Sequence, residues 1–175
     1  MNKHFVPTYL SNNVFSINPH FFVAIGKKAV LLDLDNTLDP VDIKEPSERA
    51  IAYVKDLKKE GLKVYVASNN TGKRVSTYCE KLNIEAASGL LKPFSFRLKK
   101  WIKKTGYKKE EVILVGDQIF TDVLSAKGAN IDILLTKPLS PRDSVFTLLN
   151  RKLEKPIRDK IEKKKLSKHW EEVTL

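Results

Sequence analysis

The sequence has little cysteine and no long apolar run. Its single cysteine, Cys79, cannot form an internal disulfide or anchor a metal site built from several thiolates. No stretch reaches the roughly 18 to 20 apolar residues that a membrane-spanning helix needs. The first residues show no compact apolar segment followed by a small-residue cleavage site, so secretion is not expected. These absences favour a protein of the reducing cytoplasm, in which any metal has oxygen ligands.

Acidic residues are scarce relative to basic ones. The 175 residues contain 32 Lys and Arg against 21 Asp and Glu, which gives a formal net charge of +11. A content of 42% hydrophobic and 30% charged residues is nevertheless ordinary for a globular domain and excludes a disordered chain. The excess of positive charge favours an anionic partner, namely nucleic acid, an anionic membrane surface or a phosphorylated substrate.

Short apolar runs alternate with amphipathic stretches from Ala29 onward, which is the pattern of repeated βα units around a parallel sheet. This pattern predicts an α/β fold with a mainly parallel central sheet flanked by helices. The expected strands are 29–34, 63–67, 112–115 and 131–135. Helices are expected between them, with Ser47 and Thr71 as N-caps, a stripe containing Phe94, Leu98, Trp101 and Ile102, and a short helix over 121–127.

A single domain with three parts is expected. Residues 1–28 are interpreted as an N-terminal extension packed on the core, 29–140 as the α/β core, and 141–175 as a basic helical tail. In the tail, helices are expected over 143–153 and 157–168, with Pro156 interrupting them, and the charged run is interpreted as a solvated appendage. Cys79 falls on the apolar face of the helix that follows Thr71, which favours a core residue over a nucleophile.

Polar residues follow the first strand at the position where α/β proteins carry their reactive groups. Asp33 and Asp35 come at its carboxyl end. Residues two apart in an extended chain point the same way, so the two carboxylates would lie close together and repel each other unless a cation lies between them. A hard divalent ion such as Mg²⁺ meets this need.

The later strands are also followed by polar residues that suit a phosphoryl group and its metal. Ser68, Asn69 and Asn70 follow the second strand and offer a hydroxyl and amides to phosphate oxygens. Lys92 precedes Pro93 and could neutralise an anion, and Asp117 and Asp122 follow the strand over 112–115. Each motif is weak alone, but their order along the chain is the set needed to attack a phosphoryl group, bind its oxygens and hold its metal.

These motifs resemble the four motifs of the haloacid dehalogenase superfamily of phosphatases, over residues 29 to about 135. Residues 32–38 (LDLDNTL), Ser68, Lys92 with Pro93, and residues 116–123 (GDQIFTDV) are similar to the YqeG family, which is related to mitochondrial phosphatidylglycerophosphate phosphatases. The resemblance implies a Rossmann-like fold and Mg²⁺-dependent hydrolysis of a phosphomonoester.

The resemblance also implies individual roles. Asp33 would be the nucleophile that forms an aspartyl-phosphate, and Asp35 would protonate the leaving oxygen and then activate water. Ser68 would bind the phosphoryl oxygens and Lys92 would balance their charge.

Mg²⁺ would be held by Asp33, the backbone carbonyl of Asp35, and Asp117. Asp122 would bind the metal directly, bind it through water, or orient Lys92. Four further residues are expected as neighbours of the substrate, although Thr37 and Arg74 could equally be a turn cap and a solvated helix residue: Thr37, Asn69, Asn70 and Arg74.

The sequence leaves no room for the cap domain that covers the site in many relatives. Nine residues (38–46) separate Thr37 from the helix that starts near Ser47, and twenty-three (69–91) separate Ser68 from Lys92. An open site accepts a phosphate carried on something large, and the family resemblance favours phosphatidylglycerophosphate at the inner face of the membrane. The expected peripheral contacts with anionic lipid are the lysines at 99–104 and the tail at 151–168.

Two alternatives stay open at this point. One is a polynucleotide or phosphoprotein phosphatase of the same fold. The other is a non-catalytic module that binds phosphate or RNA. Few aromatic residues lie among the basic tracts, so nucleic acid is the less favoured partner.

Overall fold

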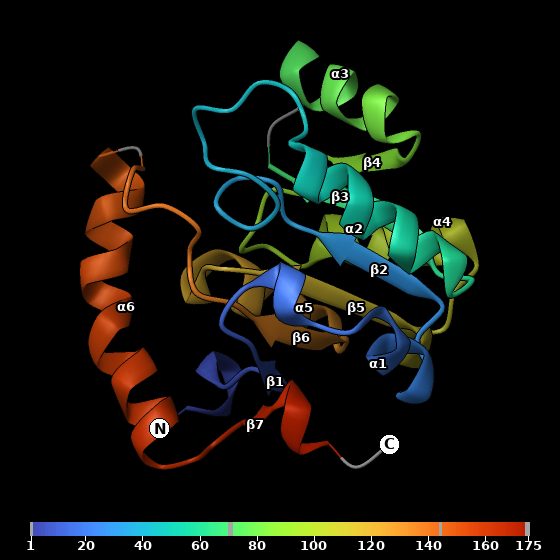
Figure 1. The fold of residues 1–175 in the computed structure, drawn as a ribbon. Coiled ribbons are helices and arrows are strands. Elements are labelled where there is room, and N and C mark those ends of the chain that lie inside the picture. Colours follow the sequence, from blue (N-terminus) through green and yellow to red (C-terminus); the bar gives the residue numbers. More distant parts are fainter. Residues whose placement is uncertain (1, 70–71, 144, 174–175) are drawn as a thin grey trace.

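The protein forms a seven-stranded sheet with helices on both faces (Figure 1). The computed structural model describes residues 2–69, 72–143 and 145–173. Strand order is β4-β3-β2-β5-β6-β1-β7, and every pairing among these strands is parallel. The strands are β1 (Tyr9–Leu10), β2 (Ala29–Leu32), β3 (Lys63–Ser68), β4 (Glu85–Ser88), β5 (Val112–Gly116), β6 (Asp132–Leu135) and β7 (Lys168–His169).

Six α-helices and several shorter turns connect the strands of the described chain. The α-helices are α1 (Pro19–Ala24), α2 (Glu48–Lys59), α3 (Lys73–Leu82), α4 (Phe96–Thr105), α5 (Leu124–Ala129) and α6 (Val145–Lys163). The shorter turns are η1 (Lys3–Phe5), η2 (Val14–Ser16), η3 (Lys109–Glu111), the π-helical η4 (Ile119–Val123) and η5 (Trp170–Glu172). The predicted class, a Rossmann-like α/β fold, is confirmed.

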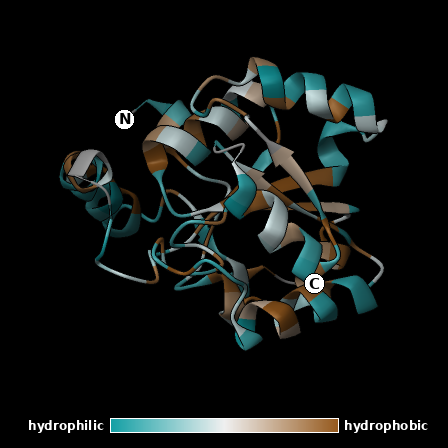
Figure 2. Cartoon of the chain, turned by 90° about the horizontal axis from the view of Figure 1, so that it is seen from above, coloured by the Kyte–Doolittle hydropathy of each residue, from teal (hydrophilic) through white to brown (hydrophobic). Residues whose placement is uncertain are grey.

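Two hydrophobic layers hold the helices against the sheet. Val30 and Leu32 of β2 pack with buried residues of α1, α2 and α3, whereas Ala29 and Leu31 pack with those of α4, α5 and α6. All four residues of β2 are fully buried, as expected of a central parallel strand with helices on both faces. Figure 2 shows the hydrophobic strands between helices whose hydropathy alternates along their length. Cys79 is buried in the first layer, as predicted.

The four predicted strands are confirmed, and three more complete the sheet. β4 follows α3 directly, and β1 and β7 come from the two segments outside the predicted core. β1 pairs with β6 on one side and with β7 on the other. The N-terminal extension and the tail are therefore joined within the central sheet.

The starts of the helices agree with the sequence in part. Ser47 caps α2, because its hydroxyl accepts a hydrogen bond from the backbone N–H of Ala50 at 3.2 Å. The interpretation of Phe94 as part of a buried stripe is wrong, because α4 begins two residues later and the Phe94 side chain is 64% exposed. The predicted cap Thr71 lies outside the described residues.

The tail forms one helix where two were expected. α6 runs through Pro156, which takes away one backbone hydrogen bond, the one to the carbonyl of Lys152. Both residues are exposed, so water can bind the carbonyl that Pro156 leaves unpaired. The helix lies along the edge of the sheet where the strands end, so the interpretation of the tail as a solvated appendage is also wrong (Figure 1).

The connections around the carboxyl edge are short. Between β2 and α2, and between β3 and α4, the described residues hold no inserted domain, only α3 and β4 in the second case. Within the described ranges, no helix is both long enough and apolar enough to cross a membrane.

Candidate active site

Asp33 stands directly after β2, at the carboxyl edge of the sheet. Its backbone N–H donates to the carbonyl of Val115 at 2.8 Å, which continues the β2–β5 pairing by one residue and fixes the direction of the side chain. The side chain is 11% exposed. The carboxylate is thus held by the sheet itself, and a small part of it remains open to solvent.

Lys92 links the carboxylate that follows β2 to one from the turn η4. Its Nζ lies 2.6 Å from Oδ1 of Asp33 and 2.6 Å from Oδ1 of Asp122, and it also donates to the carbonyl of Ala67 at 3.0 Å. The side chain is 4% exposed. Burial on its own lowers the pKa of Lys92, but the carboxylates of Asp122 and Asp33 outweigh burial and raise the pKa. Lys92 therefore carries its positive charge inside the site.

Asn69 holds the backbone of Lys92. Its side-chain carbonyl accepts from the N–H of Lys92 at 2.7 Å, and its side-chain amide donates to the carbonyl of Lys92 at 3.0 Å. Asn69 was predicted to bind substrate, and it does border the same cavity. Its amide group, however, is engaged with the loop that carries Lys92.

Three buried carboxylates converge beside Lys92. Asp33, Asp117 and Asp122 each offer an oxygen, and these oxygens lie within 4.8 Å of one another. Burial raises the pKa of Asp33 well above its ordinary value; Lys92 opposes this effect, and Asp122 and Asp117 reinforce it. Burial likewise raises the pKa of Asp117 to about 6, against the opposing charge of Arg151. A compact set of buried carboxylates fits a hard divalent cation, whose charge would favour their ionised forms.

The π-helical turn η4 brings Asp122 into this cluster. Its Oδ2 accepts from the backbone N–H of Gln118 at 3.1 Å, which leaves Oδ1 directed at Lys92. A Cβ atom on Gly116 would lie 2.4 Å from Cγ of Asp122, so only glycine permits this close approach. π-Helical turns are frequent at functional sites.

Asp35 and Thr37 follow Asp33 in the same loop and make separate contacts. Oδ1 of Asp35 accepts from Arg74 at 2.7 Å, and the guanidinium of Arg74 also donates to the carbonyl of Ile43. The hydroxyl of Thr37 lies 3.4 Å from Oδ1 of Asp117. Arg74 is thus an anchor for Asp35 rather than a solvated helix residue.

A cavity of about 660 Å³ lies against this cluster. Asp33, Asp35, Ser68 and Lys92 line it on the side of the sheet, and Thr147 and Asn150 of α6 line it on the other side. Ser68 is 3% exposed. The remaining predicted site residue, Asn70, lies outside the described residues.

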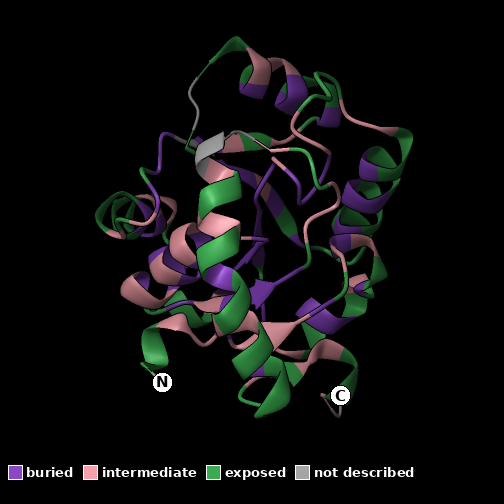
Figure 3. Ribbon diagram, turned by 90° about the vertical axis from the view of Figure 1, so that its left-hand side faces the viewer, coloured by how far each residue is buried: buried purple, intermediate pink, exposed green. Residues whose placement is uncertain are grey.

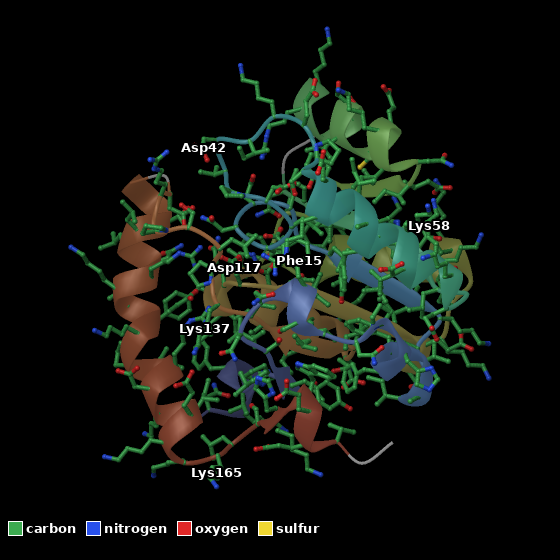
Figure 4. All side chains as sticks on the ribbon, viewed as in Figure 1. Phe15, Asp42, Lys58, Asp117, Lys137 and Lys165 are labelled. Atoms are coloured by element: carbon green, nitrogen blue, oxygen red, sulfur yellow. The ribbon has the colours of Figure 1, made fainter. Side chains whose placement is uncertain are left out.

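The tail supplies site residues that the sequence did not reveal. Arg151 forms an ion pair with Asp117 and lies 2.7 Å from Oδ2 of Asp143, and Arg158 donates to the backbone carbonyl of Asp117. Glu154 accepts from the N–H of Phe120 at 2.8 Å and so holds η4. Asp117 lies between the sheet and α6 (Figure 4). Residues 151, 154 and 158 are spaced so that all three lie on one helical face. This spacing was the one feature of the sequence that could have identified them as site residues.

Comparisons with known proteins identify the family of this chain. The model of the haloacid dehalogenase-like hydrolase family matches residues 35–136. The probable phosphatase YqeG of Bacillus subtilis (strain 168) is 31% identical over 172 residues, which is 98% of this chain and 99% of that protein.

Solved structures share the fold. The cobalt-bound deoxy-D-mannose-octulosonate 8-phosphate phosphatase of Haemophilus influenzae has a TM-score of 0.52 and 19% identity, over 75% of this chain and 89% of its own. The 3-deoxy-D-manno-octulosonate 8-phosphate phosphatase of Moraxella catarrhalis, in complex with magnesium, phosphate and the sugar acid, has a TM-score of 0.50 and 14% identity, over 68% of this chain and 82% of its own.

Fold and site therefore define a phosphatase of the haloacid dehalogenase type, as the sequence motifs predicted. The identity with YqeG extends over nearly the whole of both chains. Within the superfamily, the chain belongs to the YqeG family.

Proposed function

We propose that this phosphatase is a Mg²⁺-dependent phosphomonoesterase that works through an aspartyl-phosphate on Asp33, and that its substrate is phosphatidylglycerophosphate at the membrane surface. The observation that carries the catalytic proposal is the position of Lys92. Its Nζ lies 2.6 Å from both Asp33 and Asp122, inside a cluster of three buried carboxylates that borders a cavity.

In the first half of the reaction, a carboxylate oxygen of Asp33 attacks the phosphorus of the bound monoester. The Asp33–phosphorus bond forms while the bond from phosphorus to the leaving oxygen breaks. Asp35, on the wall of the same cavity, gives its proton to the leaving alcohol. Arg74 holds the side chain of Asp35 in one orientation through a hydrogen bond at 2.7 Å.

In the second half, water attacks the phosphorus of the aspartyl-phosphate. Asp35 takes the proton of that water, and the bond between phosphorus and the Asp33 oxygen breaks to release phosphate. Ser68 and Lys92 border the cavity where the phosphoryl oxygens would lie, one as a hydrogen-bond donor and the other as a fixed positive charge.

The residues fit the cation that the reaction needs. Asp33 and Asp117 would hold Mg²⁺ together with the backbone carbonyl of Asp35. Asp122 would orient Lys92, because its Oδ1 accepts a hydrogen bond from Nζ of Lys92 at 2.6 Å. Mg²⁺ held there would supply positive charge to offset that of the phosphoryl group.

The support for a lipid substrate has three sources. It comes from the resemblance of the motifs to the YqeG family and its phosphatidylglycerophosphate phosphatase relatives, from the absence of an inserted domain in the described chain, and from the net charge of +11. A basic protein is attracted to an anionic leaflet by about 1 kcal/mol for each Lys or Arg close to it. The proposed location is the cytoplasm, with peripheral contact at the inner face of the membrane.

The test measures phosphate release from phosphatidylglycerophosphate in mixed micelles and from a 5′-phosphorylated oligonucleotide, both with Mg²⁺. We expect faster release from the lipid, complete loss with EDTA, and complete loss in Asp33→Asn. Asp56→Asn is the matched control, because Asp56 is half exposed and pairs with Lys59 on α2. Faster release from the oligonucleotide would overturn the lipid substrate, and undiminished activity in Asp33→Asn would overturn the mechanism.

A further inference from the structure

Exposed apolar side chains occur in three segments that border the candidate active site. Among the described residues, ten large apolar side chains are well exposed, and the four most exposed are Phe94 (64%), Phe96 (57%), Leu149 (55%) and Leu153 (55%). Seven of the ten come from three segments, 43, 91–96 and 148–153. We call these seven the apolar rim: Ile43, Leu91, Phe94, Phe96, Leu148, Leu149 and Leu153.

Each segment of the apolar rim also lines the cavity or lies beside residues that do. Val41 precedes Ile43, Lys92 and Pro93 lie between Leu91 and Phe94, and Thr147 and Asn150 flank the leucines at 148 and 149. The rim therefore combines three parts of the chain that are distant in sequence and that each border this cavity. Figure 3 looks onto α6 and shows exposed positions along its outer side.

Basic residues outnumber acidic ones next to the rim. Exposed basic residues follow the phenylalanines on α4 and alternate with the leucines on α6: Arg97, Lys99, Lys100, Lys152 and Lys155. Within 91–100 and 145–155 the only acidic residue is Glu154, which is 1% exposed and bonded to η4. In the third segment, exposed Asp42 is paired with Arg142 at 3.3 Å.

Apolar side chains bordered by lysine and arginine are suited to bind an anionic lipid bilayer. In an anionic bilayer, aromatic and leucine side chains enter the boundary between headgroups and acyl chains while basic side chains contact lipid phosphates. A soluble partner of opposite charge would not by itself favour exposed phenylalanines. The same exposure in plain solvent brings no stabilisation, because a large apolar side chain gains free energy only when it leaves water.

We propose that the apolar rim is a docking surface for an anionic lipid bilayer, with the cavity mouth turned toward the headgroups. This inference rests on the proposed function and deepens it, since the phosphate of a lipid could reach Asp33 while its acyl chains stay in the membrane. The sequence suggested that basic residues alone contact the membrane. The proposed docking surface adds apolar contacts, which supply part of the binding free energy.

The test measures co-sedimentation of the full chain with vesicles of phosphatidylcholine, with and without an equal share of phosphatidylglycerol. We expect binding to the anionic vesicles, and we expect Phe94→Ser/Leu149→Ser to lower the partition coefficient about tenfold or more. Ile51→Ser/Leu166→Ser is the matched control. These residues are 43% and 40% exposed, lie outside the rim, and should leave vesicle binding within about twofold of the unmodified protein.

Hydrolysis of a water-soluble phosphate ester separates this inference from the proposed function. None of the four mutated residues lines the cavity, so both double variants should keep this activity. If the unmodified protein does not bind anionic vesicles, or binds equally well without Phe94 and Leu149, the docking surface is rejected and the phosphatase stands.

Two further outcomes are equally decisive. If binding depends on the rim but phosphatidylglycerophosphate is not hydrolysed, the lipid substrate is rejected and the docking surface stands. If the rim variant instead abolishes a dimer of the unmodified protein, without any change in vesicle binding, the rim is an interface between two copies and the membrane inference is overturned.

Discussion

Arg151 of α6 forms an ion pair with Asp117, at the carboxyl end of β5. The side chain of Asp117 is 0% exposed and that of Arg151 is 17% exposed, so the pair is buried inside the candidate site. The same guanidinium also contacts Asp143 at 2.7 Å. The tail is therefore fastened to a carboxylate of the proposed metal cluster by charge as well as by packing.

This relationship predicts the effect of Arg151→Ala. Removing the guanidinium leaves Asp117 buried without its main positive partner, so the free energy of unfolding should fall by about 3 kcal/mol in metal-free buffer. Urea unfolding followed by circular dichroism measures the change. Arg142→Ala is the matched control, because Arg142 also pairs with an aspartate but is 79% exposed, and it should leave stability unchanged. If the free energy of unfolding falls equally in the two variants, the buried ion pair stabilises the protein no more than the exposed one does.

Gly116→Ala should impair catalysis through Asp122. The added Cβ would lie 2.4 Å from Cγ and 2.5 Å from Oδ2 of Asp122, a buried side chain that cannot move aside without releasing Lys92. We expect kcat for a soluble phosphate ester to fall at least about tenfold, because small displacements of reacting groups are costly. Gly72→Ala is the control, since a Cβ there meets nothing within 4 Å. Full activity in Gly116→Ala would show that the position of Asp122 does not matter.

Asn69→Ala distinguishes positioning from substrate binding. If Asn69 acts by holding the backbone of Lys92, kcat should fall about tenfold while KM stays within about twofold. A raised KM with unchanged kcat would instead support the role predicted from the sequence, namely direct binding of substrate. Steady-state kinetics on the soluble ester separate the two, with the exposed Asn12→Ala as the control.

The thiol of Cys79 should be nearly inert in the folded protein. Burial raises its pKa from 9.0 to about 11, which lowers the thiolate fraction at pH 8 about a hundredfold, since each unit is a factor of ten. Because the folded pKa is the higher one, reactivity should rise as the pH approaches 11. Mass spectrometry after iodoacetamide treatment should show modification in urea and very little without it. Rapid modification of the native protein would contradict the interpretation of Cys79 as a core residue.

The position of the candidate site was predictable because parallel strands carry it. The apolar runs at β2, β3 and β5 end in Asp33, Ser68 and Asp117, and the carboxyl ends of neighbouring parallel strands meet at one edge of a sheet. No contact between these residues had to be known in advance. The proximity of Asp33 and Asp117 follows from strand order, whereas Asp122 reaches them through the turn η4.

The contribution of the tail was not predictable for a physical reason. Arg151 and Arg158 stand in a run of lysines and glutamates in which most side chains are solvated, and only the packing of α6 on the sheet selects these two. β1 and β7 are two residues long, so neither contains enough alternation to be recognised. Pro156 suggested a break because proline removes one helical hydrogen bond. In the structure Arg151, Glu154 and Arg158, on both sides of Pro156, hold α6 against the rest of the protein.

The position of β1 between β6 and β7 constrains when the sheet can be completed during synthesis of the chain. β7 pairs with β1, so one side of β1 keeps unpaired backbone N–H and C=O groups until the ribosome has released His169. Contacts that close so late in the sequence form slowly and leave the edge open to other chains. Nascent chains stopped before Lys168 should therefore expose unpaired backbone groups of β1, which can pair with strands of other chains. Such chains should need chaperones more than the finished protein does.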